Sequence, residues 1–171
     1  TPTFVQPIFL AILAFILLRM LKRTHLAIGI GIILYFLDLP NLNNKIIFSV
    51  VVLIASLLPD LETAFVSIRQ RRGLFTLAKK PEQPNGILHT YTVCIFVYVI
   101  LAFFYPIYAF PFFLGYSFHL FADAFTPRGI QPFWPYKERS KGHIPPGGRI
   151  DMMIFYVMIV VDAALLVKLV I

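Results

Sequence analysis

The sequence is short of charged residues and has a single cysteine in 171 residues. Charged residues make up 13% of the chain and hydrophobic residues 59%, whereas a soluble domain carries about 25% charged residues. This deficit excludes an ordinary soluble globular domain. The one cysteine, Cys94, cannot form an intrachain disulfide, and its place within an apolar run predicts a small buried hydrophobic residue.

Six apolar segments run along the chain, and the mean hydropathy of +0.83 indicates an integral membrane protein. A full span takes about 20 residues, so the shorter segments must tilt or extend into their flanks. The first segment has no basic region before it and no cleavage site after it, which favours a spanning helix over a signal peptide. The sequence therefore predicts an all-α fold: a polytopic transmembrane helical bundle of five to six membrane segments, forming one domain over 1–171. The segments cover residues 3–18, 25–37, 45–58, 89–105, 107–125 and 150–171.

Basic residues are concentrated in alternate connections between these segments. Three follow the first segment, five follow the third and five follow the fifth, so 13 of the 15 Lys and Arg residues lie in odd-numbered connections. Basic loops remain in the cytoplasm, which predicts that both termini lie outside and that connections 59–88 and 126–149 lie inside. Their spread over three loops beside the membrane argues against nucleic-acid binding and favours contact with lipid headgroups.

Under this topology, the polar residues of the apolar segments gather at the inner membrane face. We expect Pro59 to end the third segment there, because proline cannot continue the hydrogen-bond ladder of a helix. A random scatter would populate both faces, whereas Asp162, inside the last segment, is isolated and has no evident partner. The inner ends of the segments carry His25, Asp60, Glu62, His89, His119, Asp123, Arg149 and Asp151.

His119 and Asp123 are the most unusual pair of this group. They are four residues apart in an apolar segment, so they project from one face of a helix, as two ligands of one ion must. Imidazole and carboxylate together suit zinc, manganese or iron. Charged groups inside a membrane domain indicate a functional site, because their desolvation requires a partner. A carboxylate that is not used for coordination could act as a general base.

Three other members of the group have simpler explanations that the sequence leaves open. His25 alone is typical of an interfacial histidine. His89 with Thr90 could mark a helix start, with the Thr90 hydroxyl bonding the backbone. Asp60 could be the polar end of a helix.

Six stretches, in this order, resemble the YdjM-type, LexA-regulated membrane-bound metal-dependent hydrolases. The resemblance begins near residue 24, so residues 1–23 look like an added N-terminal helix on a hydrolase-like helical core, 24–171. It implies kinship with zinc-dependent phospholipases C and related nucleases, and therefore phosphoester hydrolysis at a metal cluster. The stretches are His25, "PDLE" 59–62, "GILHT" 86–90, "GYSFHLFADAFTPRGI" 115–130, "FWP" 133–135 and "GGRID" 147–151.

The chain departs from the family pattern in three places. Family members often carry "HRG" where this chain has "PNG", Pro84 to Gly86, so one expected ligand and one arginine are missing. Glu62 replaces a common aspartate, and Asp151 replaces a common glutamate. Both changes keep the carboxylate but alter the length of the side chain that carries it. The first departure removes a metal ligand.

Residues and resemblance together predict a multi-pass cell-membrane protein with a divalent metal, zinc in the first place and manganese or iron as alternatives. We expect it to hydrolyse a phosphoester of a lipid or amphiphile at the cytoplasmic face. Glu62 or Asp151 would orient or deprotonate water, and Arg149 or Arg128 would hold the phosphate, because a guanidinium binds its oxygens in a bidentate way. The metal ligands would be His25, Asp60, His89, His119 and Asp123.

The rival interpretation is a non-catalytic membrane subunit that retains a vestigial or structural metal site. The missing His-Arg pair favours this rival, and the retained His/Asp set opposes it. The expected partners are the lipid bilayer and a lipid substrate, with a membrane-protein partner or a homo-oligomer left open and nucleic acid excluded.

Overall fold

The computed structural model describes residues 23–39, 42, 44–71 and 86–171. The helices in this part of the chain confirm the all-α class, and its only β feature is an isolated bridge between Ile130 and Ser140. The apolar segment 3–18 and the added helix predicted over 1–23 fall outside the described residues, apart from Arg23. The helices are α2 (Arg23–Leu37), α3 (Lys45–Arg71), α4 (Tyr91–Phe104), α5 (Pro106–Ala124) and α6 (Arg149–Val170).

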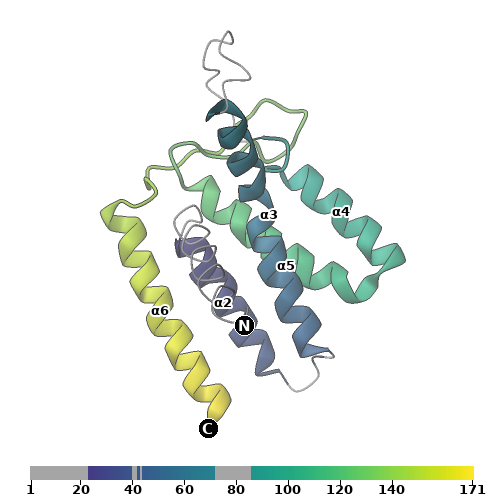
Figure 1. The fold of residues 1–171 in the computed structure, drawn as a ribbon, viewed down its shortest axis with the longest axis vertical. Coiled ribbons are helices and arrows are strands. Elements are labelled where there is room, and N and C mark those ends of the chain that lie inside the picture. Colours follow the sequence, from purple (N-terminus) through teal and green to yellow (C-terminus); the bar gives the residue numbers. More distant parts are fainter. Residues whose placement is uncertain (1–22, 40–41, 43, 72–85) are drawn as a thin grey trace, which may run out of the picture.

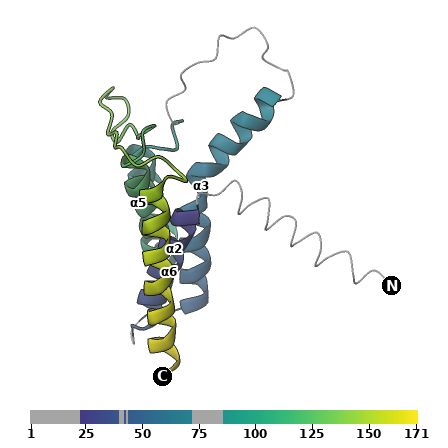
Figure 2. The same ribbon diagram turned by 90° about the vertical axis from the view of Figure 1, so that its left-hand side faces the viewer.

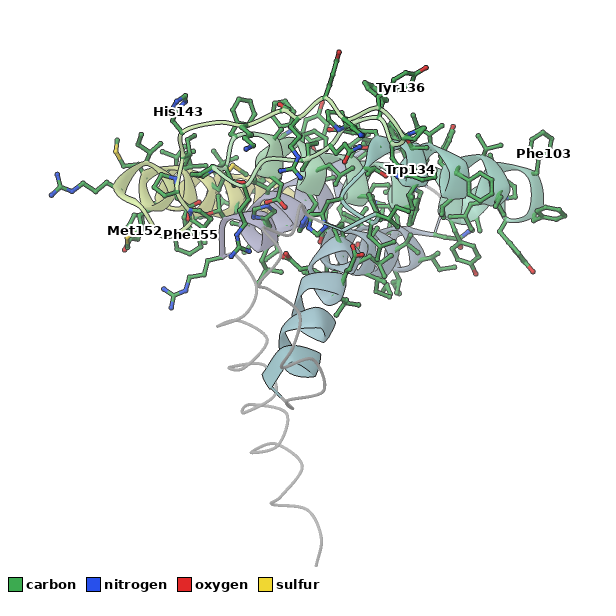
Figure 3. The ribbon with its side chains drawn as sticks, turned by 90° about the horizontal axis from the view of Figure 1, so that it is seen from above. Phe103, Trp134, Tyr136, His143, Met152 and Phe155 are labelled. Atoms are coloured by element: carbon green, nitrogen blue, oxygen red, sulfur yellow. The ribbon has the colours of Figure 1, made fainter. Side chains whose placement is uncertain are left out.

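The helices form a flattened bundle in which α5 is central. Helix α5 packs against α3 and α4, α2 packs against α3 and α5, and α6 packs against α2 (Figures 1 and 3). The core lies where α3, α4 and α5 meet, and Cys94 is fully buried there, as predicted. Because the bundle is thin, apolar side chains such as Phe103 and Met152 are exposed at its two edges (Figure 3). Such a surface suits a hydrocarbon environment.

Helix α6 is long and apolar enough to cross a membrane, and among the described helices no other passes this test. It has 22 residues, whereas a span takes about 20. Helices α2 and α4 are apolar but have only 15 and 14 residues. The structure therefore supplies one candidate span where the sequence predicts five to six.

The prediction that Pro59 ends the third segment is wrong. Helix α3 continues through Pro59 to Arg71, and Figure 2 shows its upper part leaning away from its lower part. A proline inside a helix removes one backbone hydrogen bond and crowds the preceding turn, which bends the helix without necessarily ending it. The bend leaves Asp60 and Glu62 just beyond the point where the helix leaves the bundle.

Several chain segments meet at the end of the bundle opposite the C-terminus. Helices α2 and α6 begin there, α5 ends there, and the loop 125–148 covers this end (Figure 1). This convergence places residues from distant parts of the sequence close together.

Candidate metal centre

Asp123 lies at the centre of a buried cluster of histidine rings. Its side chain is in the last turn of α5 and is 0% exposed. His25 Nε2, from the first turn of α2, lies 3.0 Å from Asp123 Oδ1. Oδ2 of Asp123 lies 3.5 Å from Nε2 of His89 and 3.5 Å from Nε2 of His119. Three imidazoles therefore surround one carboxylate inside the bundle.

The tautomer of His119 follows from its contact with α3. Its Nδ1 lies 2.7 Å from the backbone carbonyl oxygen of Ser56. A carbonyl only accepts hydrogen bonds, so Nδ1 carries the proton, and Nε2 of the neutral ring presents a lone pair. Metal-binding histidines commonly donate their second ring N–H to a backbone carbonyl in this way.

The lone pair of His119 Nε2 faces other acceptors. This buried atom has no hydrogen-bond partner among the described residues and lies 3.5 Å from Asp123 Oδ2 and 3.9 Å from Asp60 Oδ1. These separations are longer than hydrogen bonds of about 2.7–3.2 Å. Two ligands about 2.1 Å from a tetrahedral ion lie about 3.4 Å apart. The orphaned atom and the spacing of its neighbours therefore fit a shared cation.

Two groups of side chains meet the geometric requirement for a metal site, and His119 belongs to both. One group is His25, His119 and Asp123, and the other is Asp60, His89 and His119. Within each group the candidate ligand atoms lie within 4.8 Å of one another. Nitrogen and carboxylate oxygen donors of this kind suit zinc, manganese or iron. The structure thus brings together all five residues predicted as metal ligands.

Glu62 reaches the cluster from beyond the bend in α3. Its Oε2 accepts a hydrogen bond of 3.1 Å from the backbone N–H of Leu88 and lies 3.7 Å from His89 Nδ1. A Cβ on Gly86 would collide with the Glu62 carboxylate, so a larger residue there would displace this carboxylate from its present position. Glu62 thereby connects the bent helix to the turn that carries His89.

His89 precedes α4 and is held by its neighbours. Thr90 is the N-cap of α4, and its hydroxyl accepts a bond from the backbone N–H of Val93, as the simpler interpretation of this pair predicted. On the other side, the Tyr116 hydroxyl donates to the backbone carbonyl of Leu88. His89 is 1% exposed, so the helix start and the buried ring coexist.

Gly115 explains why α5 comes close enough to α3 to form the cluster. A Cβ at this position would collide with the backbone carbonyl of Val52. The absence of a side chain permits close contact between the two helix backbones. One turn later along α5, His119 then reaches the Ser56 carbonyl.

Asp151 occupies a different position from the other predicted residues. Its Oδ1 accepts a bond of 2.6 Å from the Thr24 hydroxyl, and its Oδ2 accepts one of 2.7 Å from the backbone N–H of Gly147. These bonds tie the first turn of α6 to the start of α2, next to His25. Asp151 therefore borders the cluster rather than joining it.

The two arginines predicted to hold phosphate lie at the same end of the molecule but are exposed. Arg128 follows α5 and Arg149 begins α6. Neither forms an ion pair within the described ranges. His143 is also exposed on the loop above the bundle (Figure 3).

Sequence reasoning missed the residues that position the ligands. These residues do no chemistry themselves, and their roles depend on contacts between distant segments. Most stand within or beside the quoted motifs, which was the available signal. They are Thr24, Ser56, Gly86, Gly115 and Tyr116.

Comparison with protein families gives a match over most of the chain. The model of a family described as "YdjM inner membrane protein" matches residues 20–169, which is most of the chain. No curated protein and no solved structure matches.

Proposed function

The chain belongs to the family of YdjM inner membrane proteins, and from this premise we propose that it is a membrane-embedded metal-dependent hydrolase. The substrate we propose is a phosphoester of a lipid or amphiphile that reaches the site from the cytoplasmic face. The buried His/Asp cluster at one end of the bundle supports the proposal.

The environment of His119 Nε2 is the strongest support for a metal ion in this cluster. The Ser56 carbonyl holds the proton of the neutral ring on Nδ1, which leaves Nε2 as an acceptor, and carboxylate oxygens of Asp123 and Asp60 lie 3.5 and 3.9 Å from Nε2. Acceptors held this close in a buried site repel one another unless a cation lies between them. A proton on Nε2 would relieve the repulsion less well, because these distances are too long for a hydrogen bond.

The chemistry that a divalent metal supplies when bound is Lewis acidity, which polarises phosphoryl oxygens and makes water nucleophilic near neutral pH. Zinc is the metal we propose first, with manganese or iron as alternatives. The ligands we propose are His25, Asp60, His89, His119 and Asp123.

Hydrolysis also requires a general base for water and ligands for the phosphate group. Glu62 is one-quarter exposed and lies beside His89, so it can orient that ring and accept a proton from water. Asp151 is the other candidate base, although two hydrogen bonds already hold its carboxylate. Arg149 and Arg128 are the proposed phosphate ligands, since their exposed guanidinium groups lie at the same end of the bundle.

We also propose a multi-pass topology with both termini outside. The asymmetry of basic residues supports it, and so does the position of the cluster at the end where α2 and α6 begin. Reporter fusions in loops 63–80 and 137–146 should indicate the cytoplasm, and one near residues 41–44 the outside. Reversal of both long loops would contradict the orientation and the proposed route of the substrate.

A non-catalytic membrane subunit is the second candidate function. The sequence "PNG" at Pro84 to Gly86, where family members often carry "HRG", favours it because one ligand is absent. In that case the cluster is structural or vestigial. The exposed apolar surface would then bind a membrane-protein partner or a second copy of the chain.

Metal loading combined with hydrolysis assays distinguishes the two functions. The full chain in lipid nanodiscs should be stripped with a chelator and reloaded with zinc or manganese. We expect metal bound in stoichiometric amounts, and hydrolysis of an aryl phosphate or a phosphoester lipid that disappears with chelation and returns with metal. Stoichiometric metal without hydrolysis across a broad phosphoester panel would favour the subunit, and absence of both would contradict the metal centre itself.

A further inference from the structure

An apolar cavity of about 300 Å³ lies beside the cluster. It is bounded by the first turns of α2, the end of α5, the loop 125–148 and the start of α6. Helix α6 packs against α2, so the space between α6 and the end of α5 is not filled by helix contacts. The loop covers this space near Ile144 and Pro146.

The lining of the cavity is mainly apolar. Its walls are formed mainly by Ile28, Phe121, Phe125 and Ile154. A hydrocarbon chain placed against these walls gains the free energy of leaving water.

One residue of the cluster also lines the cavity. His25 lines the cavity and also places its Nε2 3.0 Å from Asp123 Oδ1. Thr24 and Asp151, joined by their 2.6 Å hydrogen bond, line it as well. A ligand with its apolar part between the walls would thus present its polar end to the metal-binding residues.

We propose that this cavity binds the hydrocarbon chain of the substrate, and that the substrate class is a single-chain amphiphile with a terminal phosphoester. A volume of about 300 Å³ is at the lower end of ligand pockets, which favours one chain over a pair of chains. The inference rests on the proposed function, because the phosphoester is assigned to the cluster. Each methylene group buried there should strengthen binding about fourfold.

Photolabelling tests the inference without relying on turnover. The probe is an alkyl phosphate of about 16 carbons with a diazirine near the end of its chain, added to the full protein in nanodiscs. Mass spectrometry of the labelled peptides should place most label on the cavity walls formed by α5 and α6. Label spread evenly over the outer face of α6, with no enrichment at the walls, would overturn the proposal.

A matched pair of substitutions tests the position of the chain. Ala122 lines the cavity, and Ala163 is exposed on α6 away from it. Ala122→Phe should reduce labelling of the walls at least tenfold while the metal content is retained, and Ala163→Phe should leave labelling and hydrolysis unchanged. Equal labelling of both variants would contradict the inference. If Ala122→Phe does not fold, Ile28→Phe replaces it, with the same expected loss.

Competition at equal mole fraction tests the substrate class. Unlabelled hexadecyl phosphate should displace the probe at least tenfold better than a two-chain phosphatidate. Equal displacement would overturn the single-chain assignment. Wall labelling with no hydrolysis would refute the hydrolase and leave the binding site supported, whereas hydrolysis without wall labelling would refute the binding site alone.

Discussion

Asp123 and Asp162 are both buried aspartates within helices of an apolar chain, but their surroundings differ. Asp123, at the end of α5, lies among three histidine rings. Asp162 is 7% exposed near the middle of α6, and within the described part of the chain neither of its side-chain oxygens has a hydrogen-bond partner. Its Oδ1 would lie 2.8 Å from a Cβ added to Gly31 of α2, so the fold accommodates it by leaving space.

The difference teaches that burial of a carboxylate does not by itself identify a site. An isolated carboxylate in an apolar contact costs free energy and has nothing to bind a ligand with. At Asp123, by contrast, groups from α2, α3, α5 and the turn before α4 converge on one point. The convergence of several ligand types marks the candidate centre.

The largest expected effect comes from removing the charge of each aspartate in turn. Asp123→Asn keeps the size of the side chain but removes the negative charge that balances an ion. Affinity for zinc or manganese should fall about 100-fold or more, and any phosphoester hydrolysis should disappear with it. Asp162→Asn is the matched control and should leave both unchanged. Metal content and hydrolysis rate of the purified variants are the measurements.

Equal effects of the two Asn variants would break the comparison. If both lost metal, general unfolding would be the cause, and circular dichroism would reveal it. If neither lost metal, the ion would bind elsewhere.

Replacement of Glu62 should separate turnover from metal binding. Glu62→Gln removes a base but keeps an acceptor for the backbone N–H of Leu88. We expect the hydrolysis rate to fall about 100-fold, within the usual range for a general base, with the metal largely retained. Glu138→Gln, on the exposed loop, is the control. An unchanged rate would exclude Glu62 as the base and leave Asp151.

A smaller effect should follow from changing one glycine in the α3–α5 contact and one in the α2–α6 contact. Gly115→Ala places a methyl group against the rigid backbone carbonyl of Val52 and should destabilise the protein by about 1–3 kcal/mol. Gly31→Ala meets the end of the Asp162 side chain, which can move, so a smaller loss is expected. Thermal unfolding in nanodiscs measures both. A larger loss for Gly31→Ala would show that the α2–α6 contact, and not the α3–α5 contact, limits stability.

The sequence predicted the described helices better than their ends. Apolar segments 25–37, 107–125 and 150–171 agree closely with α2, α5 and α6. Pro59 was misjudged because a proline inside a helix removes one backbone hydrogen bond and can bend the helix without ending it.

The metal-binding residues of the candidate site were more predictable than the contacts that position them. His119 and Asp123 were indicated by their spacing of four residues and by their polarity within an apolar segment. The proton on His119 Nδ1 depends on the carbonyl of Ser56, 63 residues earlier in the chain. The close contact of Gly86 with the Glu62 carboxylate depends on the position of α3. Such requirements arise only when the segments pack together.

X-ray absorption at the metal edge tests the central claim, that His119 and Asp123 hold one ion, most directly. The full chain should be loaded with zinc and compared with Asp123→Asn and Asp162→Asn. The account predicts nitrogen and oxygen ligands at about 2.0–2.2 Å with imidazole scattering in the parent and in Asp162→Asn, and loss of this signal in Asp123→Asn. An oxygen-only shell, or an imidazole signal that persists unchanged in Asp123→Asn, would contradict it.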